Sequence, residues 1–356
     1  MNERFYIEQM ITGSFVKYNR LNELISYSYS GSNCTEINLF IDLNSVLKPM
    51  YSIDSWSYKY KNIYEITATI LNMCGHYREF FRVIGVATNI YLIYGLNCPN
   101  TNNSFIPKYN EKFIRSYMVK NDTTKMISEN LSVLNIMCQY LPKIYFFDIG
   151  TCEVSSMIDR IINLTNTKNK GFENIVISKD PLMLQLVPEH NVRVIRPNKT
   201  KEGDQSYIVD NTNLWNKFIQ DYRKAKMPRV SIPNNFFQNV LVMTRVPERS
   251  LYSIMSIPKA FQIIDIGIKT GFLDINKFYS QDTMNTVLTA LGLQYNPTEL
   301  EMRFRAINTH YQSTYIIPIE KPEFKRLRLI DLEDIQSLKE IISKYFENVP
   351  IDIDKL

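Results

Sequence analysis

The chain has 356 residues, of which 45% are hydrophobic and 22% are charged. This length and composition suit a globular protein with one large domain or two coupled domains, and they exclude an intrinsically disordered chain. Lys and Arg outnumber Asp and Glu by 41 to 36, a mildly basic balance that is compatible with a nucleic-acid partner without indicating one.

The apolar patterns predict helices that alternate with short buried strands. We expect an N-terminal helical extension over 1–35, a strand at 37–42, a helix at 61–81, a strand at 83–94, a polar insert at 97–125, a helix at 123–140 and a strand at 143–148. There follow a helix at 153–164, a strand at 174–178 that leads into a helical turn through 186, a strand at 192–195, helices over 235–292, and a helical tail at 300–356.

Strands that alternate with helices predict an α/β fold, with a mainly parallel central sheet and helices on both of its faces. We expect three parts: the extension (1–35), an α/β domain (36–230) that carries the insert, and an α-helical C-terminal subdomain with its tail (231–356).

The cysteines and the N-terminus bear on the compartment. The five cysteines form no Cys-x-x-Cys pair; they are Cys34, Cys74, Cys98, Cys138 and Cys152. An odd, scattered set indicates a reducing compartment and argues against a disulfide framework or a zinc site. Residues 1–10 lack a signal-peptide pattern, and no apolar run is long enough to span a bilayer. We therefore expect neither secretion through a signal peptide nor a membrane partner.

Three acidic residues lie at or just after predicted strand ends. Asp42 ends one strand, Asp180 follows another, and Glu153 opens the helix after a third. The carboxyl ends of parallel strands meet at one edge of a sheet, so these carboxylates can share a crevice. Mg²⁺ and Mn²⁺ prefer several oxygen ligands, and phosphodiester hydrolysis with two metal ions uses clusters of carboxylates. The alternative is that each acid is a helix cap or a hydrogen-bond partner.

Six segments, in chain order, resemble motifs of the 5′→3′ exonuclease and flap endonuclease family, which is PIN-like and has phage members. They are 40–45 for the first strand and its metal-binding Asp, 152–158 for the Glu-Ala-Asp-Asp helix start, 176–186 for the Asp-x-Asp strand, 192–195 for the next strand, 255–260 for the Gly-x-Gly-Pro-Lys of a helix–three-turn–helix, and 324–332 for the closing segment. The resemblance implies metal binding by Asp42, Glu153 and Asp180, and contact with duplex DNA.

The chain departs from this family at the positions of the metal ligands. Ser155 and Ser156 replace paired aspartates, Leu182 replaces the second Asp of Asp-x-Asp, and Arg249 stands where the family has an Asp ahead of the helix–three-turn–helix. The strand at 83–94 also lacks the family's Asp. Two cations about 4 Å apart need many negative ligands to offset their repulsion. We therefore expect a degenerate member without catalytic activity or a metal cofactor; one residual Mg²⁺ or Mn²⁺ is the alternative.

The other polar residues that could act as ligands are isolated in the sequence. His76, His190 and His310 lack the spacing of a metal pair or a catalytic triad, so we expect core or surface roles for them. Asp159 is not expected to replace a lost ligand, because it lies about 240° farther round its helix than Glu153.

Two segments are candidates for DNA contact. The insert interleaves cations with aromatic residues, and its candidates are Lys108, Tyr109, Lys112 and Arg115. In the family such an insert arches over single-stranded DNA; a solvated amphipathic helix is the plain alternative. In the helix–three-turn–helix, Met255 and Ile257 replace glycines that let a phosphate approach the backbone. Lys259 remains there as a candidate phosphate contact.

These features predict a catalytically degenerate, flap-endonuclease-like protein that acts as a structural or assembly component. We expect protein partners in a larger assembly such as a phage virion, with the virion or the host cytoplasm as its location. The insert and the N-terminal extension are the expected contact surfaces. The alternatives are a metal-dependent 5′→3′ nuclease with a reduced metal site, and a non-cleaving DNA-binding replication accessory. Any DNA binding should be weak, non-specific and strongly dependent on salt.

Overall fold

The computed structural model describes residues 36–45, 63–83, 85–95, 121–149, 153–166, 172–190, 192–197, 199–200, 203–204, 206–223, 228–244, 253–276, 281–293, 295–307 and 340. Its centre is a six-stranded sheet with the order β3-β2-β1-β4-β5-β8. The strands are β1 (Glu36–Asp42), β2 (Ala87–Tyr94), β3 (Ile144–Asp148), β4 (Phe172–Ile177), β5 (Arg193–Arg196) and β8 (Tyr207–Val209).

The first five of these strands pair in parallel, and β8 pairs antiparallel with β5. The predicted mainly parallel α/β sheet is therefore confirmed. Neither β8 nor the short hairpin of β6 (Lys199–Thr200) and β7 (Gly203–Asp204) was predicted from the sequence.

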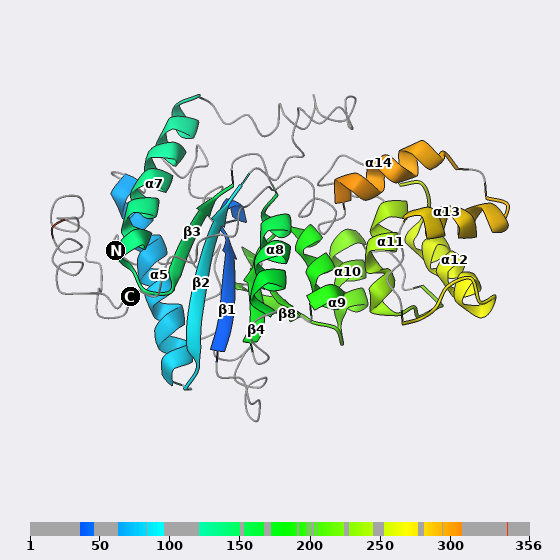
Figure 1. Cartoon of the computed structure of the whole chain (residues 1–356), viewed down its shortest axis with the longest axis horizontal. Coiled ribbons are helices and arrows are strands. Elements are labelled where there is room, and N and C mark those ends of the chain that lie inside the picture. Colours follow the sequence, from blue (N-terminus) through cyan, green and yellow to red (C-terminus); the bar gives the residue numbers. More distant parts are fainter. Residues whose placement is uncertain are drawn as a thin grey trace.

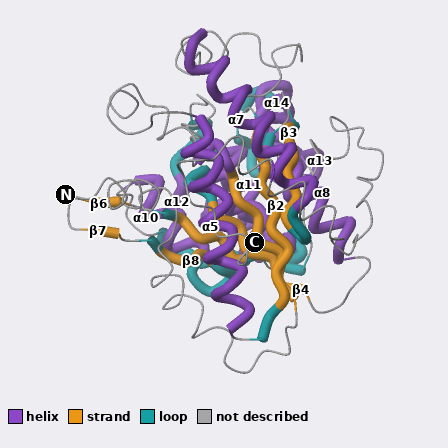
Figure 2. The backbone as a smooth tube through the Cα atoms, turned by 90° about the vertical axis from the view of Figure 1, so that its left-hand side faces the viewer, coloured by secondary structure: helices purple, strands orange, loops and turns teal. Residues whose placement is uncertain are grey.

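Helices cover both faces of the sheet. Helices α5 (Ile63–Val83) and α7 (Asn121–Tyr140) lie on one face, and α8 (Val154–Asn166) lies on the other (Figure 1). Seen from the α5 side, α5 and α7 lie in front of the strands (Figure 2). None of the described helices is both long and apolar enough to cross a membrane.

A helical region extends from the sheet on the side of α8 and β8 (Figure 1). It contains η1 (Pro181–Gln185), α9 (Leu186–His190), α10 (Leu214–Arg223), η2 (Asn234–Phe236), α11 (Phe237–Met243), α12 (Ile257–Lys269), α13 (Gln281–Ala290) and α14 (Pro297–Ile307). The predicted helical character of 235–292 is confirmed for its described residues. One hydrophobic cluster runs without a break from Phe40 in β1 to Ile307 in α14.

The alternation of side chains along β1 decides which groups face α8. Ile37, Leu39 and Ile41 pack in the cluster with α5 and α7, whereas Phe40 packs in the cluster with α8. Because side chains alternate along a strand, Asp42 points to the same face as Phe40. The last side chain of β1 is thus a buried carboxyl group on the α8 face.

Three buried asparagines span the strands on this same face. Asn38 donates to Asn174 Oδ1 (3.0 Å), and Asn89 donates to Asn38 Oδ1 (3.1 Å). The parallel register places Asn38 opposite both Asn89 and Asn174. Since a slip of one residue would turn these amides to the other face, the asparagines favour the register that aligns the strand ends.

One predicted boundary was wrong. The strand expected from 83 starts at Ala87, because α5 continues to Val83 and then ends in a Schellman turn. In that turn Gly85 has a φ of 79° and its N–H donates to Arg82 O, while Val86 N–H donates to Phe81 O. The helix expected at 123–140 is α7, which begins at Asn121. The extension (1–35), the rest of the insert (97–120) and the tail beyond 307, apart from residue 340, lie outside the described residues.

Candidate functional site at the carboxyl edge of the sheet

Asp42 is held by donors from its own chain. The residue is fully buried at the end of β1, which lies beside the end of β4. Its Oδ2 accepts hydrogen bonds from the hydroxyls of Ser45 and Ser178, each at 2.6 Å, and its Oδ1 accepts one from Asn44 N–H at 3.0 Å. Both carboxylate oxygens, which were expected to bind metal, therefore have protein partners.

The same two hydroxyls tie Asp42 to the segment after β4. Ser45 Oγ accepts from Lys179 N–H and Ser178 Oγ accepts from Asp180 N–H, both at 2.9 Å. Asp180 itself is the N-cap of η1, because its Oδ1 accepts from Leu182 N–H at 2.9 Å. These are the contacts of hydrogen-bond partners and caps.

Burial governs the charge of Asp42. The pKa of the Asp42 carboxyl is raised to about 6, chiefly by desolvation and to a smaller extent by the negative charge of Asp180, while the hydrogen bonds from Ser178 and Ser45 lower it. A group with this pKa is ionised at neutral pH at a cost in free energy. The serine hydroxyls partly offset the cost that a metal cation would otherwise relieve.

The remaining predicted ligand positions offer few carboxylates. Glu153 is buried just before α8, and Ser155 and Ser156 are buried in the first turn of that helix with hydroxyls in place of carboxylates. Leu182 is part of the hydrophobic core. Arg249 lies outside the described residues, so its role stays a prediction.

The acids at this edge do not fit a two-metal centre. In the described part of the chain, Asp42, Glu153 and Asp180 do not form a group whose ligand atoms all lie within 4.8 Å of one another. Asp148 ends β3, but β2 separates it from β1, and that spacing is about 10 Å. The described residues at this edge thus lack the concentration of negative charge that two cations need.

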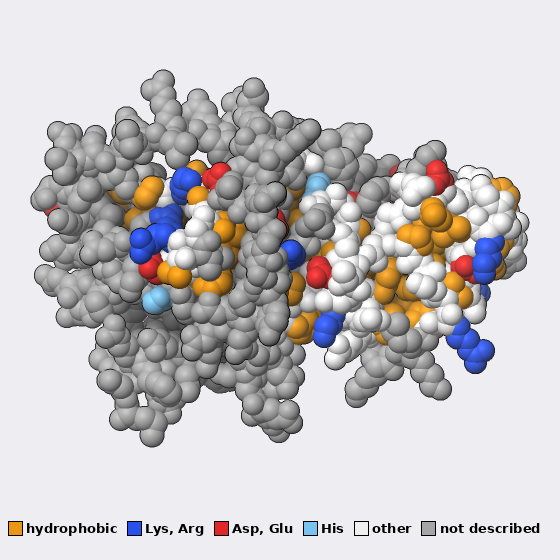
Figure 3. All heavy atoms as spheres, turned by 90° about the horizontal axis from the view of Figure 1, so that it is seen from below, with side chains coloured by type: hydrophobic (Ala, Val, Ile, Leu, Met, Phe, Trp, Pro, Cys, Tyr) orange, Lys and Arg blue, Asp and Glu red, His pale blue; other side chains and the backbone are white. Residues whose placement is uncertain are grey.

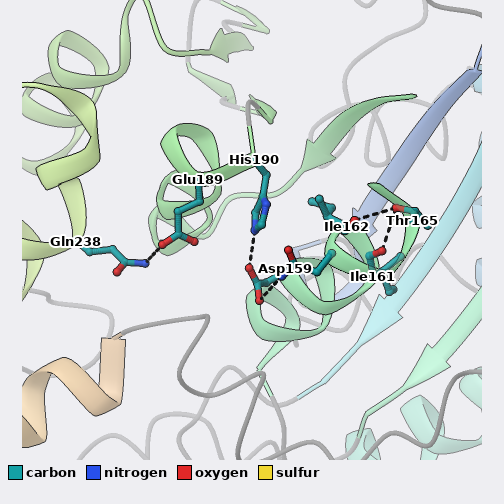
Figure 4. Close-up of polar contacts among 8 residues, drawn as sticks. Asp159, Ile161, Ile162, Thr165, Glu189, His190 and Gln238 are labelled. Carbon is teal, nitrogen blue, oxygen red and sulfur yellow. Dashed lines mark hydrogen bonds and ion pairs between the residues drawn. The ribbon is translucent and has the colours of Figure 1, made fainter. Parts of the chain in front are cut away.

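A second polar cluster, which was not predicted from the sequence, lies between α8 and α9. His190 Nε2 and Asp159 Oδ1 are 2.6 Å apart, and Glu189 lies beside them (Figure 4). His190 has no ligand-type partner at helical spacing in the sequence, but α8 and α9 pack together and bring it against Asp159, 31 positions away. The adjacent pair Glu189-His190 was the only sequence signal, and neither residue has a ligand-type neighbour at helical spacing.

The segment that resembles a helix–three-turn–helix turns its amides inward. Ile254 N–H and Met255 N–H both donate to Met243 O, at 3.1 and 3.0 Å. Met255 and Ile257, which stand at the glycine positions, pack against the hydrophobic core. Lys259 is exposed on α12. The insert candidates Lys108, Tyr109, Lys112 and Arg115 lie outside the described residues, so their DNA contacts stay predictions.

Comparison with known proteins gives similarity in structure only. The chain is similar to phage 5′-nucleases. A bacteriophage T5 protein co-crystallised with metal ions matches 88% of this chain and 100% of its own, with 9% identity and a TM-score of 0.49. Bacteriophage T5 flap endonuclease in a complex with DNA and metal ions matches 87% of this chain and 98% of its own, with 11% identity and a TM-score of 0.49.

T5 5′-exonuclease with bound zinc covers the same shares of the two chains, 87% and 98%, with 10% identity and a TM-score of 0.47. No family model and no curated protein matches the chain.

Proposed function

We propose that this chain is a non-cleaving protein with a nuclease-like fold that acts by binding other proteins. The observation that carries the proposal is the engagement of Asp42, whose two carboxylate oxygens accept three hydrogen bonds from Asn44, Ser45 and Ser178. A metal ion at Asp42 would have to displace these donors, with Asp180 occupied as a cap and Leu182 buried in the core. Loss of so many ligands removes the means to activate water for phosphodiester hydrolysis.

The state of the phosphate-binding segment supports the same proposal. A helix–three-turn–helix holds phosphate through backbone N–H groups that glycines leave accessible. Here the N–H groups of Ile254 and Met255 donate to Met243 O within the protein, and bulky side chains stand at the glycine positions. Sequence-neutral DNA binding is then limited to charge contacts from groups such as Lys259.

The surface of the helical region favours a protein partner. Ile266, Phe272 and Ile275 are large hydrophobic residues with 41% to 51% of their surface exposed, at the end of α12 and just beyond it. Hydrophobic side chains gather on this end of the molecule (Figure 3). Grouped exposed apolar side chains are typical of contact sites. We place the partner in a larger assembly, such as a phage virion, with the host cytoplasm as the other location.

A cleavage assay tests the catalytic half of this proposal. We expect the purified full chain to leave flap, nicked and single-stranded DNA intact in Mg²⁺ or Mn²⁺, because the described residues do not supply the carboxylates needed for two ions. An active 5′-nuclease in parallel reactions controls for substrate quality. Robust cleavage that disappears in Asp180→Ala would instead establish a metal-dependent nuclease with a reduced site.

Sedimentation tests the binding half. We expect the native protein to migrate with a larger assembly and Phe272→Ser/Ile275→Ser to migrate as a free monomer with an unchanged melting temperature. Val83→Ser is the matched control, since Val83 is 70% exposed but lies at the end of α5 in the sheet region. A free monomer throughout purification from the native source would contradict the proposal. Tight, salt-insensitive binding of forked DNA would favour a replication accessory.

A further inference from the structure

Asp159, Glu189 and His190 bring together three side chains of the kinds that bind transition metals. Asp159 comes from α8, and Glu189 and His190 come from the end of α9. One ligand atom from each residue lies within 4.8 Å of the other two, and all three side chains point toward one another (Figure 4). None of them belongs to the Asp42, Glu153 and Asp180 set.

Neighbouring amides orient both carboxyl groups. Asn163 Nδ2 donates to Asp159 Oδ2 at 3.3 Å, and Gln238 Nε2, from α11, donates to Glu189 Oε1 at 2.5 Å. The other oxygen of each group lies on the side of His190 (Figure 4). Amides that hold one carboxylate oxygen while the second faces a shared point are typical of the surroundings of a metal site.

The charge balance of the cluster favours a bound cation. Asp159 is fully buried, and the side chain of His190 is only 12% exposed. Burial and the charge of Asp159 raise the pKa of Glu189 to about 7, and His190 opposes the rise. Two carboxyl groups beside one imidazole can be neutralised by protons or by a divalent ion. Protons and the metal ion therefore compete for this cluster near neutral pH.

We propose that Asp159, Glu189 and His190 bind one transition-metal dication of the Zn²⁺ or Mn²⁺ type, which fastens α8 and α9 to each other and, through Gln238, to α11. Three protein ligands leave one position of a tetrahedral ion for water. Ligand atoms about 2.0–2.2 Å from such an ion lie about 3.4 Å apart. The 2.6 Å separation of His190 and Asp159 therefore lengthens by less than about 1 Å on binding. Mg²⁺ binds more weakly, because it prefers oxygen ligands to imidazole.

Metal titration of the full chain, stripped with chelator, tests the proposal. Equilibrium dialysis at pH 7.5 should find one high-affinity Zn²⁺ per chain, with affinity falling in the order Zn²⁺, Mn²⁺, Mg²⁺. Saturating Zn²⁺ should raise the melting temperature by about 5 °C. His190→Gln should weaken Zn²⁺ binding by more than about tenfold. His76→Gln, at an exposed position in α5, should leave it unchanged.

Glu189→Gln separates metal binding from stability. At pH 8 it removes a carboxylate that is costly to bury ionised, and the amide oxygen can still accept from Gln238, so the metal-free variant should melt at the same temperature or higher. Saturating Zn²⁺ should no longer raise the melting temperature of this variant. Asp42→Asn should still bind one Zn²⁺ per chain and should still show the Zn²⁺-dependent rise in melting temperature. No high-affinity Zn²⁺, or Zn²⁺ binding that survives in both Glu189→Gln and His190→Gln, would overturn the proposal without bearing on cleavage or on protein partners.

Discussion

Replacing Arg303 by Met is expected to lower the free energy of unfolding by about 3 kcal/mol. Arg303 lies in α14 with 2% of its surface exposed, and its guanidinium donates to Val242 O (2.7 Å) and Thr244 O (2.5 Å) at the end of α11. These carbonyls belong to the last turn of the helix, where intrahelical donors are lacking and a cation is favoured. A methionine fills similar volume but leaves the two buried acceptors without this donor.

Denaturant unfolding measures the effect. Arg82→Met is the matched control, because the Arg82 side chain is 74% exposed and pairs with Glu79 on the surface of α5, so the loss of stability should be much smaller than for Arg303→Met. Arg303→Lys should lie between the wild type and Arg303→Met, because an ammonium keeps the charge but reproduces the two-carbonyl geometry poorly. Equal stability of Arg303→Met and Arg82→Met would show that the buried contacts contribute little.

Replacing Asp42 by Asn is expected to change how stability depends on pH. The pKa of Asp42 is raised to about 6 from 3.8, so the folded state holds its proton more tightly than the unfolded state. The contribution of this group to the free energy of unfolding is therefore fully present below about pH 4, and it is lost as the pH rises through 6. The wild type loses up to about 3 kcal/mol of stability in this way. The Asp42→Asn variant shows no such loss, because Asn cannot titrate.

The measurement is the difference in unfolding free energy between the wild type and Asp42→Asn at pH 4 and at pH 7. Between pH 4 and pH 7, the unfolding free energy of the variant relative to that of the wild type should rise by up to about 3 kcal/mol. Any packing effect that does not depend on pH cancels in this comparison. Asp265→Asn is the control, since Asp265 is partly exposed and pairs with Lys269 on α12. A difference that does not vary with pH would contradict the burial of an ionisable Asp42.

Much of the sheet and its acidic edge could be predicted from local patterns. The strand ending at Asp42 and the strand preceding Asp180 are short apolar runs followed by polar residues, and such runs are read without knowledge of their partners. The end of α5 was misplaced, because Val83 continues a helix or begins a strand equally well by hydrophobicity. The helix ends after Val83 because Gly85 adopts a left-handed conformation, in a turn whose hydrogen bonds form only in the folded chain.

The sequence by itself determined the mainly parallel α/β fold, the acids at the strand ends, and the absence of carboxylates at 155, 156 and 182. These depend on residue type and local periodicity. Only the tertiary structure decided that Ser45 and Ser178 occupy the oxygens of Asp42, that Arg303 caps α11, and that His190 meets Asp159. Each of these contacts joins side chains from different elements. Their geometry follows from how helices and strands pack, and spacing along the chain carries no information about it.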